Sequence, residues 1–399
     1  MKMRVGILTS GGDCPGLNAT IRGVAKALYQ RMGDKVEIIG ILNGYDGLIN
    51  GNYRVMAPDE FSGILTVGGT ILGTKRTPFK MMRVVGDDKV DKVAAMKKTY
   101  KDAKLDCLLC LGGNGTHKTA NLLSQEGLNI IGLPKTIDND IFGTDVTFGF
   151  HTAVDIATEV IDRIHTTAGS HSRVMCIEIM GNKAGWLTLY SGIAGGADII
   201  LLPERPFDEN VFLEKVAQLE KDRHNVIIAA SEGVKNKDGV FLCDLVSTAG
   251  QLDAFGHKAI LSGTSRYLAD LIHVRLGCKT RAIEFSTLQR CASHLASRTD
   301  ITEAYQVGGA SVEAAYRGET GKMCAIRRIS DMPYRTETEM VDVQKVANLE
   351  KRVPDDWISQ DGMHVTEAFH HYARPLIQAE LTPLYIAGLP HHIYMKNQK

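Results

Sequence analysis

Two carboxylates stand two residues apart in the segment PKTIDND, residues 134–140, which also carries an ammonium and a hydroxyl group. The segment follows the apolar run Asn129–Leu133, which predicts a buried strand. If the loop is extended, Asp138 and Asp140 face the same way, so one can act as a general base while the other helps to hold a metal ion. An Asx-type turn with solvated carboxylates is the ordinary interpretation of an isolated DND, and we rank it second here.

Two glycine-rich turns follow other predicted strands. SGGDCPGLN, residues 10–18, comes after Arg4–Leu8, and GGNGTHK, residues 112–118, comes after Leu105–Leu111. Each turn precedes a helical pattern, so backbone N–H groups and the positive end of a helix can bind a phosphate there. The second turn is not a Walker A loop, since no glycine precedes Lys118, and it lacks the third glycine of the dinucleotide fingerprint. Two such turns on neighbouring strand ends indicate a nucleotide or diphosphate site; one alone would be a structural turn.

These motifs lie in a chain where short β-branched apolar runs alternate with amphipathic helical stretches. This alternation predicts an α/β fold with mainly parallel sheets and right-handed crossovers. The apolar runs lack strict period-two polarity, which is typical of strands buried on both faces. Glycine provides 40 of the 399 residues, and the excess lies just after the predicted strands. There the backbone can approach a ligand closely.

Composition excludes several classes of protein. A length of 399 residues predicts two or three domains, and 44% hydrophobic and 23% charged residues are typical of a soluble globular protein. The formal net charge is zero and there is no basic run, so we expect no nucleic-acid partner. No apolar run approaches the ~18 residues needed to cross a bilayer, and the apolar stretch near the N-terminus is too short for a signal peptide. Scattered cysteines favour a reduced, cytoplasmic setting. Because no apolar run is long enough to cross a bilayer, we expect no membrane partner.

The chain resembles the 6-phosphofructokinase family, because its motifs occur in that family's order from the N-terminus to about Arg328: TSGGDCPGLNA, GGNGT, PKTIDND, Ser172-Arg173 with Met180-Gly181, Ser231-Glu232-Gly233, and Arg281 with Gln289-Arg290. KTIDND, MGNKAGW and EFSTLQRCASHLASR look most like the mixed-substrate bacterial subgroup called group III, whose members use either ATP or pyrophosphate. The resemblance implies that ATP and Mg²⁺ phosphorylate D-fructose 6-phosphate at its C1 hydroxyl. The products are D-fructose 1,6-bisphosphate and ADP, and the reaction is the first committing step of glycolysis.

The resemblance also implies a role for each matching residue. Asp138 aligns with the general base that takes the C1 proton, Asp140 with the carboxylate that organises metal and substrate, and Thr136 with the hydroxyl that positions the reacting oxygens. Phosphoryl transfer needs mostly positioning and charge neutralisation, which such a set supplies. The implied donor-binding residues are Gly12, Arg76, Gly113, Asn114, Gly115, Thr116 and Lys135. The implied sugar-phosphate residues are Thr136, Ile137, Asp138, Arg173, Met180, Gly181, Asn182, Glu232, Arg281 and Arg290.

Three positions depart from the family pattern. Asn114 stands where relatives commonly carry a magnesium-binding Asp, and an amide oxygen is the weaker ligand, so the metal would depend on Asp138, Asp140 and the donor phosphates. Asn182 replaces an arginine that supports the transferring phosphoryl group in ATP enzymes. Thr287 replaces a sugar-binding histidine.

Two positions bear on the phosphoryl donor. Pyrophosphate enzymes usually carry Asp where this chain has Gly115, and that carboxylate would crowd and repel the α-phosphate of a nucleotide. Lys135, in contrast, is the residue found in pyrophosphate enzymes. We expect ATP because a steric block is harder to evade than a charge is to tolerate. The reversible pyrophosphate reaction remains the alternative, and Asn114 and Asn182 leave open a third hypothesis, a non-catalytic sugar-phosphate sensor.

Pattern and resemblance together predict two interleaved three-layer α/β domains with the active site in the cleft between them. We place the donor domain at residues 1–148 and 291–322. The sugar-phosphate domain is placed at residues 149–290 and 323–399, including a C-terminal extension. In the family, Arg173 and Arg281 reach the sugar phosphate of a neighbouring subunit, so we expect a homodimer or homotetramer. Arg22 and Lys26 match allosteric positions of some relatives, although a solvated helix face is the preferred interpretation.

Overall fold

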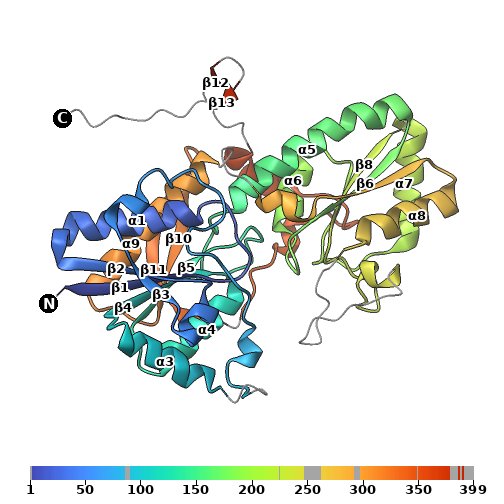
Figure 1. Cartoon of the computed structure of the whole chain (residues 1–399). Helices are drawn as coiled ribbons and strands as arrows, with labels where there is room; N and C mark the ends of the chain where they lie inside the picture. The colour runs from blue at the N-terminus through green and yellow to red at the C-terminus, as the bar shows by residue number, and fades with distance from the viewer. Residues whose placement is uncertain are drawn as a thin grey trace.

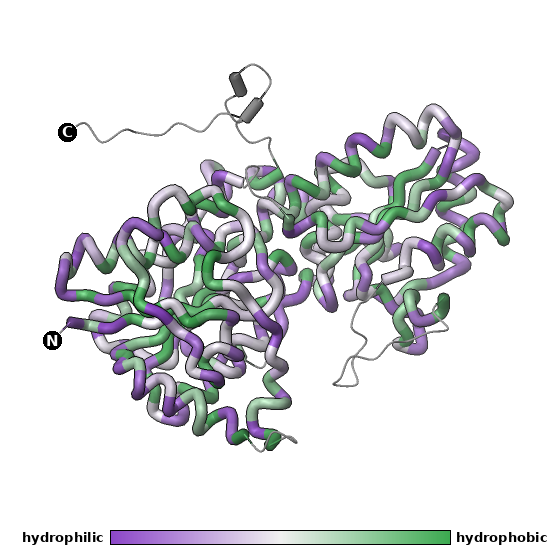
Figure 2. The backbone as a smooth tube through the Cα atoms, in the orientation of Figure 1, coloured by the Kyte–Doolittle hydropathy of each residue, from purple (hydrophilic) through white to green (hydrophobic). Residues whose placement is uncertain are grey.

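The computed structural model describes residues 2–85, 90–223, 225–246, 262–291, 297–347 and 349–377, and the backbone of 385–386 and 389–390. The chain forms two lobes, each with a β-sheet between layers of helices (Figure 1). Apolar segments concentrate in the two sheets, while polar segments lie on the outer helices (Figure 2). The predicted fold class, α/β with mainly parallel sheets, is confirmed.

The first lobe contains a seven-stranded sheet in the order β11-β10-β5-β4-β1-β2-β3. Its inner pairs are parallel, whereas β3 and β11 run antiparallel to their neighbours at the two edges. The strands are β1 (Met3–Thr9), β2 (Val36–Ile41), β3 (Tyr53–Met56), β4 (Cys107–Gly112), β5 (Ile130–Pro134), β10 (Lys322–Ser330) and β11 (Arg335–Asp342). The central strands β4 and β5 are buried along their whole length, which explains their continuous apolar runs.

Helices cover both faces of this sheet (Figure 1). One face carries α1 (Leu17–Met32) and α9 (Arg298–Tyr316), and the other carries α3 (Lys92–Asp102) and α4 (Asn114–Gln125). The helices α1 and α9 pack very closely, since a Cβ atom on Gly23 would lie 2.4 Å from the carbonyl oxygen of Tyr305. The short helices are α2 (Tyr45–Asn50), α10 (Val343–Val346) and α11 (Glu367–Ala373), and a two-stranded hairpin pairs β12 (Tyr385–Ile386) with β13 (Leu389–Pro390).

The second lobe contains a parallel sheet in the order β7-β8-β6-β9. Its strands are β6 (Val174–Ile179), β7 (Ile199–Leu201), β8 (Val226–Ser231) and β9 (Thr280–Glu284). The helices around it are α5 (Phe150–His171), α6 (Trp186–Ala194), α7 (Glu209–Arg223) and α8 (Thr264–Leu276). One buried apolar cluster continues from β1 through α5 and α6 to β8, so the two lobes share a core.

The predicted domain boundary needs a correction in the C-terminal part. We placed residues 323–399 with the sugar-phosphate domain, but β10 pairs with β5 and β11, so Lys322–Asp342 extends the first sheet. The described residues that follow, 349–377, lie between the lobes, where the ring centroids of Trp357 and Trp186 are 5.9 Å apart. Residues 292–296 of the predicted donor segment and most of 378–399 lie outside the described residues.

Among the helices in the described ranges, none is long and apolar enough to cross a membrane.

Candidate active site

A cavity of about 590 Å³ opens where the carboxyl ends of strands from the two sheets meet. Loops after β1, β5, β6 and β8 and the segment after β9 contribute to it, which is the usual place for a ligand in parallel α/β sheets. The cavity brings together seven of the predicted site residues: Gly12, Arg76, Asp138, Met180, Asn182, Glu232 and Arg290. Thr287, which departs from the family pattern, also lines it.

The loop after β5 is not extended between its two carboxylates. Asn139 has a φ of 53°, in the left-handed region, and this turn directs the two acids to different surroundings. Asp138 lines the cavity. Asp140 is buried and accepts a hydrogen bond of 2.9 Å from the side-chain amide of Asn114. Asp138 and Asp140 were predicted to face the same way if the loop is extended. The turn at Asn139 means that the loop is not extended there, so they do not.

Burial dominates the electrostatics of both carboxyl groups. Burial and, to a smaller extent, the nearby Glu232 raise the pKa of Asp138, while Lys135 and Arg290 lower it. The resulting pKa is about 6. Burial and the charge of Asp138 raise the pKa of Asp140 to about 7. A carboxyl group with a pKa of about 6 is still ionised at neutral pH, and it is more basic than an ordinary Asp. Asp138 therefore suits a general base.

The two glycine turns adjoin one another beside the cavity. The Lys135 ammonium donates a hydrogen bond to the carbonyl oxygen of Gly12, and its backbone N–H donates to Gly112 at 3.1 Å. Burial lowers the pKa of Lys135. Gly113, Asn114, Gly115 and Thr116 do not line the cavity, but they follow β4 at the same sheet edge. No heavy atom outside its immediate chain neighbours lies within 4 Å of a Cβ built on Gly115, so the space there is open.

The opposite wall carries groups suited to a sugar phosphate. Glu232 accepts a hydrogen bond of 2.9 Å from the backbone N–H of Asn182, and burial raises its pKa to about 7. The Arg290 guanidinium lies 3.7 Å from the Asp13 carboxylate. Gly181 has a φ of 147°, and a Cβ there would lie 2.6 Å from the carbonyl oxygen of Ala184, so the turn after β6 requires glycine.

Arg173 and Arg281 do not line this cavity. Arg173 immediately precedes β6, and Arg281 lies opposite Met175 in β9, so both sit at the amino ends of parallel strands. Met180, at the carboxyl end of β6, is about seven residues or roughly 20 Å from Arg173. Within one copy of the chain, these two arginines are therefore apart from the other residues predicted to bind the sugar phosphate.

Sequence reasoning missed several residues of the cavity wall, among them Asp13, Thr74 and Glu178. Glu178 accepts hydrogen bonds from the backbone N–H groups of Gly263, at 3.1 Å, and Ser265, at 3.0 Å, at the start of α8. The sequence did contain a signal for Glu178. It is the acidic residue in the buried strand VMCIEI, and a buried carboxyl group has to face a polar partner or a cavity.

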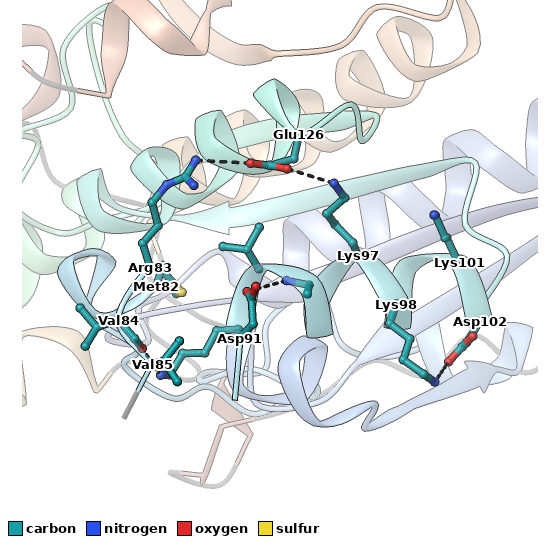
Figure 3. A pocket seen from close by; sticks show the side chains of 13 residues that line it. Met82, Arg83, Val84, Val85, Asp91, Lys97, Lys98, Lys101, Asp102 and Glu126 are labelled. Atoms are coloured by element: carbon teal, nitrogen blue, oxygen red, sulfur yellow. Dashed lines mark hydrogen bonds and ion pairs between the residues drawn. The ribbon is translucent and has the colours of Figure 1, made fainter. Parts of the chain in front are cut away.

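A second cavity of about 570 Å³ lies beside α3 and the end of α4. Figure 3 shows that three of its labelled basic side chains, Arg83, Lys97 and Lys98, face acidic partners. Arg83 and Lys97 pair with the two carboxylate oxygens of Glu126, and Lys98 pairs with Asp102. It contains none of the predicted site residues.

The phosphofructokinase family model matches residues 4–315, and the chain belongs to this family. An ATP-dependent 6-phosphofructokinase of Spirochaeta thermophila is 48% identical over 356 residues, covering 88% of this chain and 93% of the relative. A pyrophosphate--fructose 6-phosphate 1-phosphotransferase of Amycolatopsis methanolica is 42% identical over 326 residues, covering 82% and 91%. The crystal structure of a pyrophosphate-dependent phosphofructokinase from Marinobacter aquaeolei superposes with a TM-score of 0.81 at 27% identity, covering 99% and 97%. The family predicted from the motifs is confirmed.

Proposed function

We propose that this chain phosphorylates D-fructose 6-phosphate at the C1 hydroxyl with ATP, giving D-fructose 1,6-bisphosphate and ADP in the first committing step of glycolysis. The observation that carries the proposal is the position of Asp138. Its half-buried side chain lines a cavity between the Gly12 turn on one side and Glu232 and Arg290 on the other. A general base thus stands between a phosphate-binding turn and groups suited to a sugar phosphate. We expect the reaction to take place in the cytoplasm, because the scattered cysteines favour a reduced setting.

The chain's residues divide the work of phosphoryl transfer. Asp138 accepts the C1 proton as that oxygen attacks the terminal phosphoryl group. Thr136 accepts a hydrogen bond of 3.1 Å from the backbone N–H of Asp138 and holds the loop beside the reacting oxygens. Arg76 and Arg290 supply positive charge in the cavity, where negative charge accumulates on the transferring group. Glu232 accepts sugar hydroxyl groups.

Asp138 and Asp140 are the residues that would hold Mg²⁺. In the described part of the chain, no cluster of three or more His, Cys, Asp or Glu side chains offers a self-sufficient metal site. Asp140 does not line the cavity, but the charge of Asp138 acts on it, so the two carboxyl groups lie near one another. Mg²⁺ is usually bound by one or two carboxylates, which this pair can supply, together with substrate phosphates. When bound, the ion neutralises charge on the donor phosphates. The side-chain amide of Asn114 donates a hydrogen bond to the Asp140 carboxylate, so we assign Asn114 the role of orienting that carboxylate.

ATP is the donor that the site favours. Gly115 leaves open space where a side chain would crowd a nucleotide. The Lys135 ammonium, which would favour pyrophosphate, already donates to the Gly12 carbonyl. The pyrophosphate-dependent reaction is the second candidate, because a relative with 42% identity is named a pyrophosphate--fructose 6-phosphate 1-phosphotransferase.

We also propose that the working enzyme is a homo-oligomer, because Arg173 and Arg281 lie away from the cavity of their own chain. In a dimer or tetramer these arginines would complete the sugar-phosphate site of a neighbouring copy, as the family resemblance implies.

The direct test is the formation of fructose 1,6-bisphosphate by the purified protein from fructose 6-phosphate with Mg-ATP and, separately, Mg-pyrophosphate. The proposal expects product with ATP. Product with pyrophosphate alone would establish the second candidate. Binding of fructose 6-phosphate without product from either donor would leave the sugar-phosphate sensor as the function.

A further inference from the structure

A segment near the C-terminal end of the described chain packs directly against the loop that carries Asp138 and Asp140. The backbone N–H of Lys351 donates a 2.9 Å hydrogen bond to the carbonyl oxygen of Asp140. Next to it, Glu350 forms an antiparallel bridge with Ile141. The proposed catalytic loop is therefore held by residues more than 200 positions later in the sequence.

The side chain of Lys351 reaches further into the same loop. Its ammonium donates to the side-chain oxygen of Asn139 at 2.8 Å, to the carbonyl oxygen of Thr144 at 3.2 Å, and to that of Asp145 at 2.8 Å. An ammonium has three donor hydrogens and no acceptor. All three are used on one loop, so Lys351 fixes its two ends relative to one another.

Asn139 is the residue where this support matters most. Its left-handed conformation, with a φ of 53°, sends Asp138 into the cavity and leaves Asp140 against Asn114. A residue other than glycine keeps such a conformation only where its surroundings determine it. The Asn139 side-chain oxygen accepts from the backbone N–H of Thr147 at 3.1 Å and from Lys351. Those two bonds orient its side chain and so stabilise the turn.

The other side of the segment is attached to the second lobe. The Trp186 indole N–H donates to the carbonyl oxygen of Lys351 at 3.0 Å, and the Lys351 ammonium lies 5.0 Å from the centroid of the Trp186 ring. Glu204 accepts from the backbone N–H groups of Val353, at 3.2 Å, and Gly185, at 2.9 Å. Lys351 thus connects the loop of the first lobe to the start of α6 in the second.

We propose that Lys351 is a positioning residue for the proposed base Asp138, an inference that rests on the proposed function. Lys351 does not line the cavity, so it does not bind the sugar phosphate itself. Without its ammonium, the turn at Asn139 loses one of the two bonds to its side chain, and the Asp138 carboxyl moves away from the C1 hydroxyl. The rate of the chemical step falls, while the groups that bind fructose 6-phosphate stay in place.

The test replaces Lys351→Met, which keeps the length of the side chain and removes the ammonium. Because a displacement of about 1 Å at a reacting centre costs on the order of 100-fold, we expect kcat to fall about 10- to 100-fold with KM for fructose 6-phosphate within about 3-fold. Lys345→Met is the matched control, since its side chain is 79% exposed in the same part of the chain. Its kcat is expected to stay at the wild-type value.

A second variant, Asn139→Gly, removes the one side-chain acceptor among the three acceptors of the lysine, while glycine keeps the backbone conformation without strain. It is expected to lower kcat as Lys351→Met does. The double variant should lose little more than either single one, because both remove the Lys351–Asn139 hydrogen bond that is proposed to position Asp138. This non-additivity, measured on folded protein, separates positioning from a general loss of stability. If Lys351→Met does not fold, Asn139→Gly carries the test alone.

A wild-type kcat in folded Lys351→Met or Asn139→Gly would overturn the inference. The inference would also be overturned if the fold-losses in kcat of the two single variants multiplied in the double variant. A fall in kcat that is fully explained by the fraction of unfolded protein would overturn it as well. A wild-type protein that makes no bisphosphate from either donor would overturn the proposed function itself. That failure is distinct, because it is seen before any variant is compared.

Discussion

At the scale of single residues, the proposed chemistry depends on the carboxyl group of Asp138. Replacing Asp138→Asn keeps the size of the side chain and removes the base, so we expect kcat to fall about 10²- to 10⁴-fold. Burial raises the pKa of Asp138 to about 6, and only the ionised form accepts the C1 proton. We therefore predict that kcat/KM of the wild-type enzyme rises with pH through about 6, where Asp138 ionises, and continues to rise through about 7, where Asp140 and Glu232 ionise.

A profile of kcat/KM against pH checks this prediction in both proteins. The asparagine variant should retain its weak activity without the component of the acidic limb near pH 6. Asp102→Asn, on the surface helix α3, is the control and should keep both the wild-type rate and that component, because its side chain is 52% exposed. A component near pH 6 that persists in Asp138→Asn would assign that titration to another group.

Motifs and the family resemblance identified residues of the cavity wall but not the direction of every side chain. Asp138 was predicted from the loop after a strand, Glu232 and Arg290 were implied by the resemblance, and these residues do meet in the cavity. The separate surroundings of Asp140 were not predictable, because the turn at Asn139 depends on partners 8 and 212 positions away in the chain. No local pattern carries such information.

At the scale of secondary-structure elements, the start of α4 determines where the second glycine turn lies. The buried His117 ring in its first turn contacts the carbonyl oxygen of Gly113 through Nδ1 at 2.9 Å. A Cβ on Gly132 of β5 would lie 2.6 Å from that ring. Gly132→Ala should therefore displace His117, cost about 1–3 kcal/mol of the free energy of unfolding, and raise KM for the donor.

Urea unfolding and donor kinetics measure both effects. Gly115→Ala is the stability control, since its added Cβ meets no heavy atom within 4 Å beyond its immediate neighbours. The control should not destabilise the protein and is expected to stabilise it by about 0.4–1 kcal/mol, because Gly115 is helical and alanine loses less conformational entropy than glycine on folding. Equal stabilities for the two alanine variants would contradict the packing described for His117.

Strand prediction succeeded in the sheet interiors and failed at an edge for a physical reason. The run Asn129–Leu133 was predicted as a strand and corresponds to β5, every residue of which is buried. The second half of β10 and all of β11 lie at a sheet edge, where exposed polar side chains alternate irregularly with apolar ones. Their sequence therefore lacks the apolar run on which the other assignments relied, and their place in the first sheet was missed.

At the scale of the whole molecule, the account predicts sites shared between copies of the chain. Arg281→Ala and Glu232→Ala should each lower kcat/KM for fructose 6-phosphate, since each removes one part of the sugar-phosphate site. If Arg281 serves a neighbouring copy, hybrids of the two variants contain some sites with both residues intact. Unfolding and refolding the variants together should then give more activity than the sum of the two refolded separately. Activity equal to that sum, or an active monomer in sedimentation, would contradict a shared site.

The central claim is ATP-dependent phosphorylation of fructose 6-phosphate at a site kept open by Gly115. The most direct measurement is kcat/KM for fructose 6-phosphate with Mg-ATP and with Mg-pyrophosphate, made on one preparation each of the wild-type protein and Gly115→Asp. The account predicts that ATP is the better donor for the wild type and that the added carboxylate abolishes the use of ATP by repelling the nucleotide. A wild-type enzyme that prefers pyrophosphate would contradict it and would assign donor choice to Lys135.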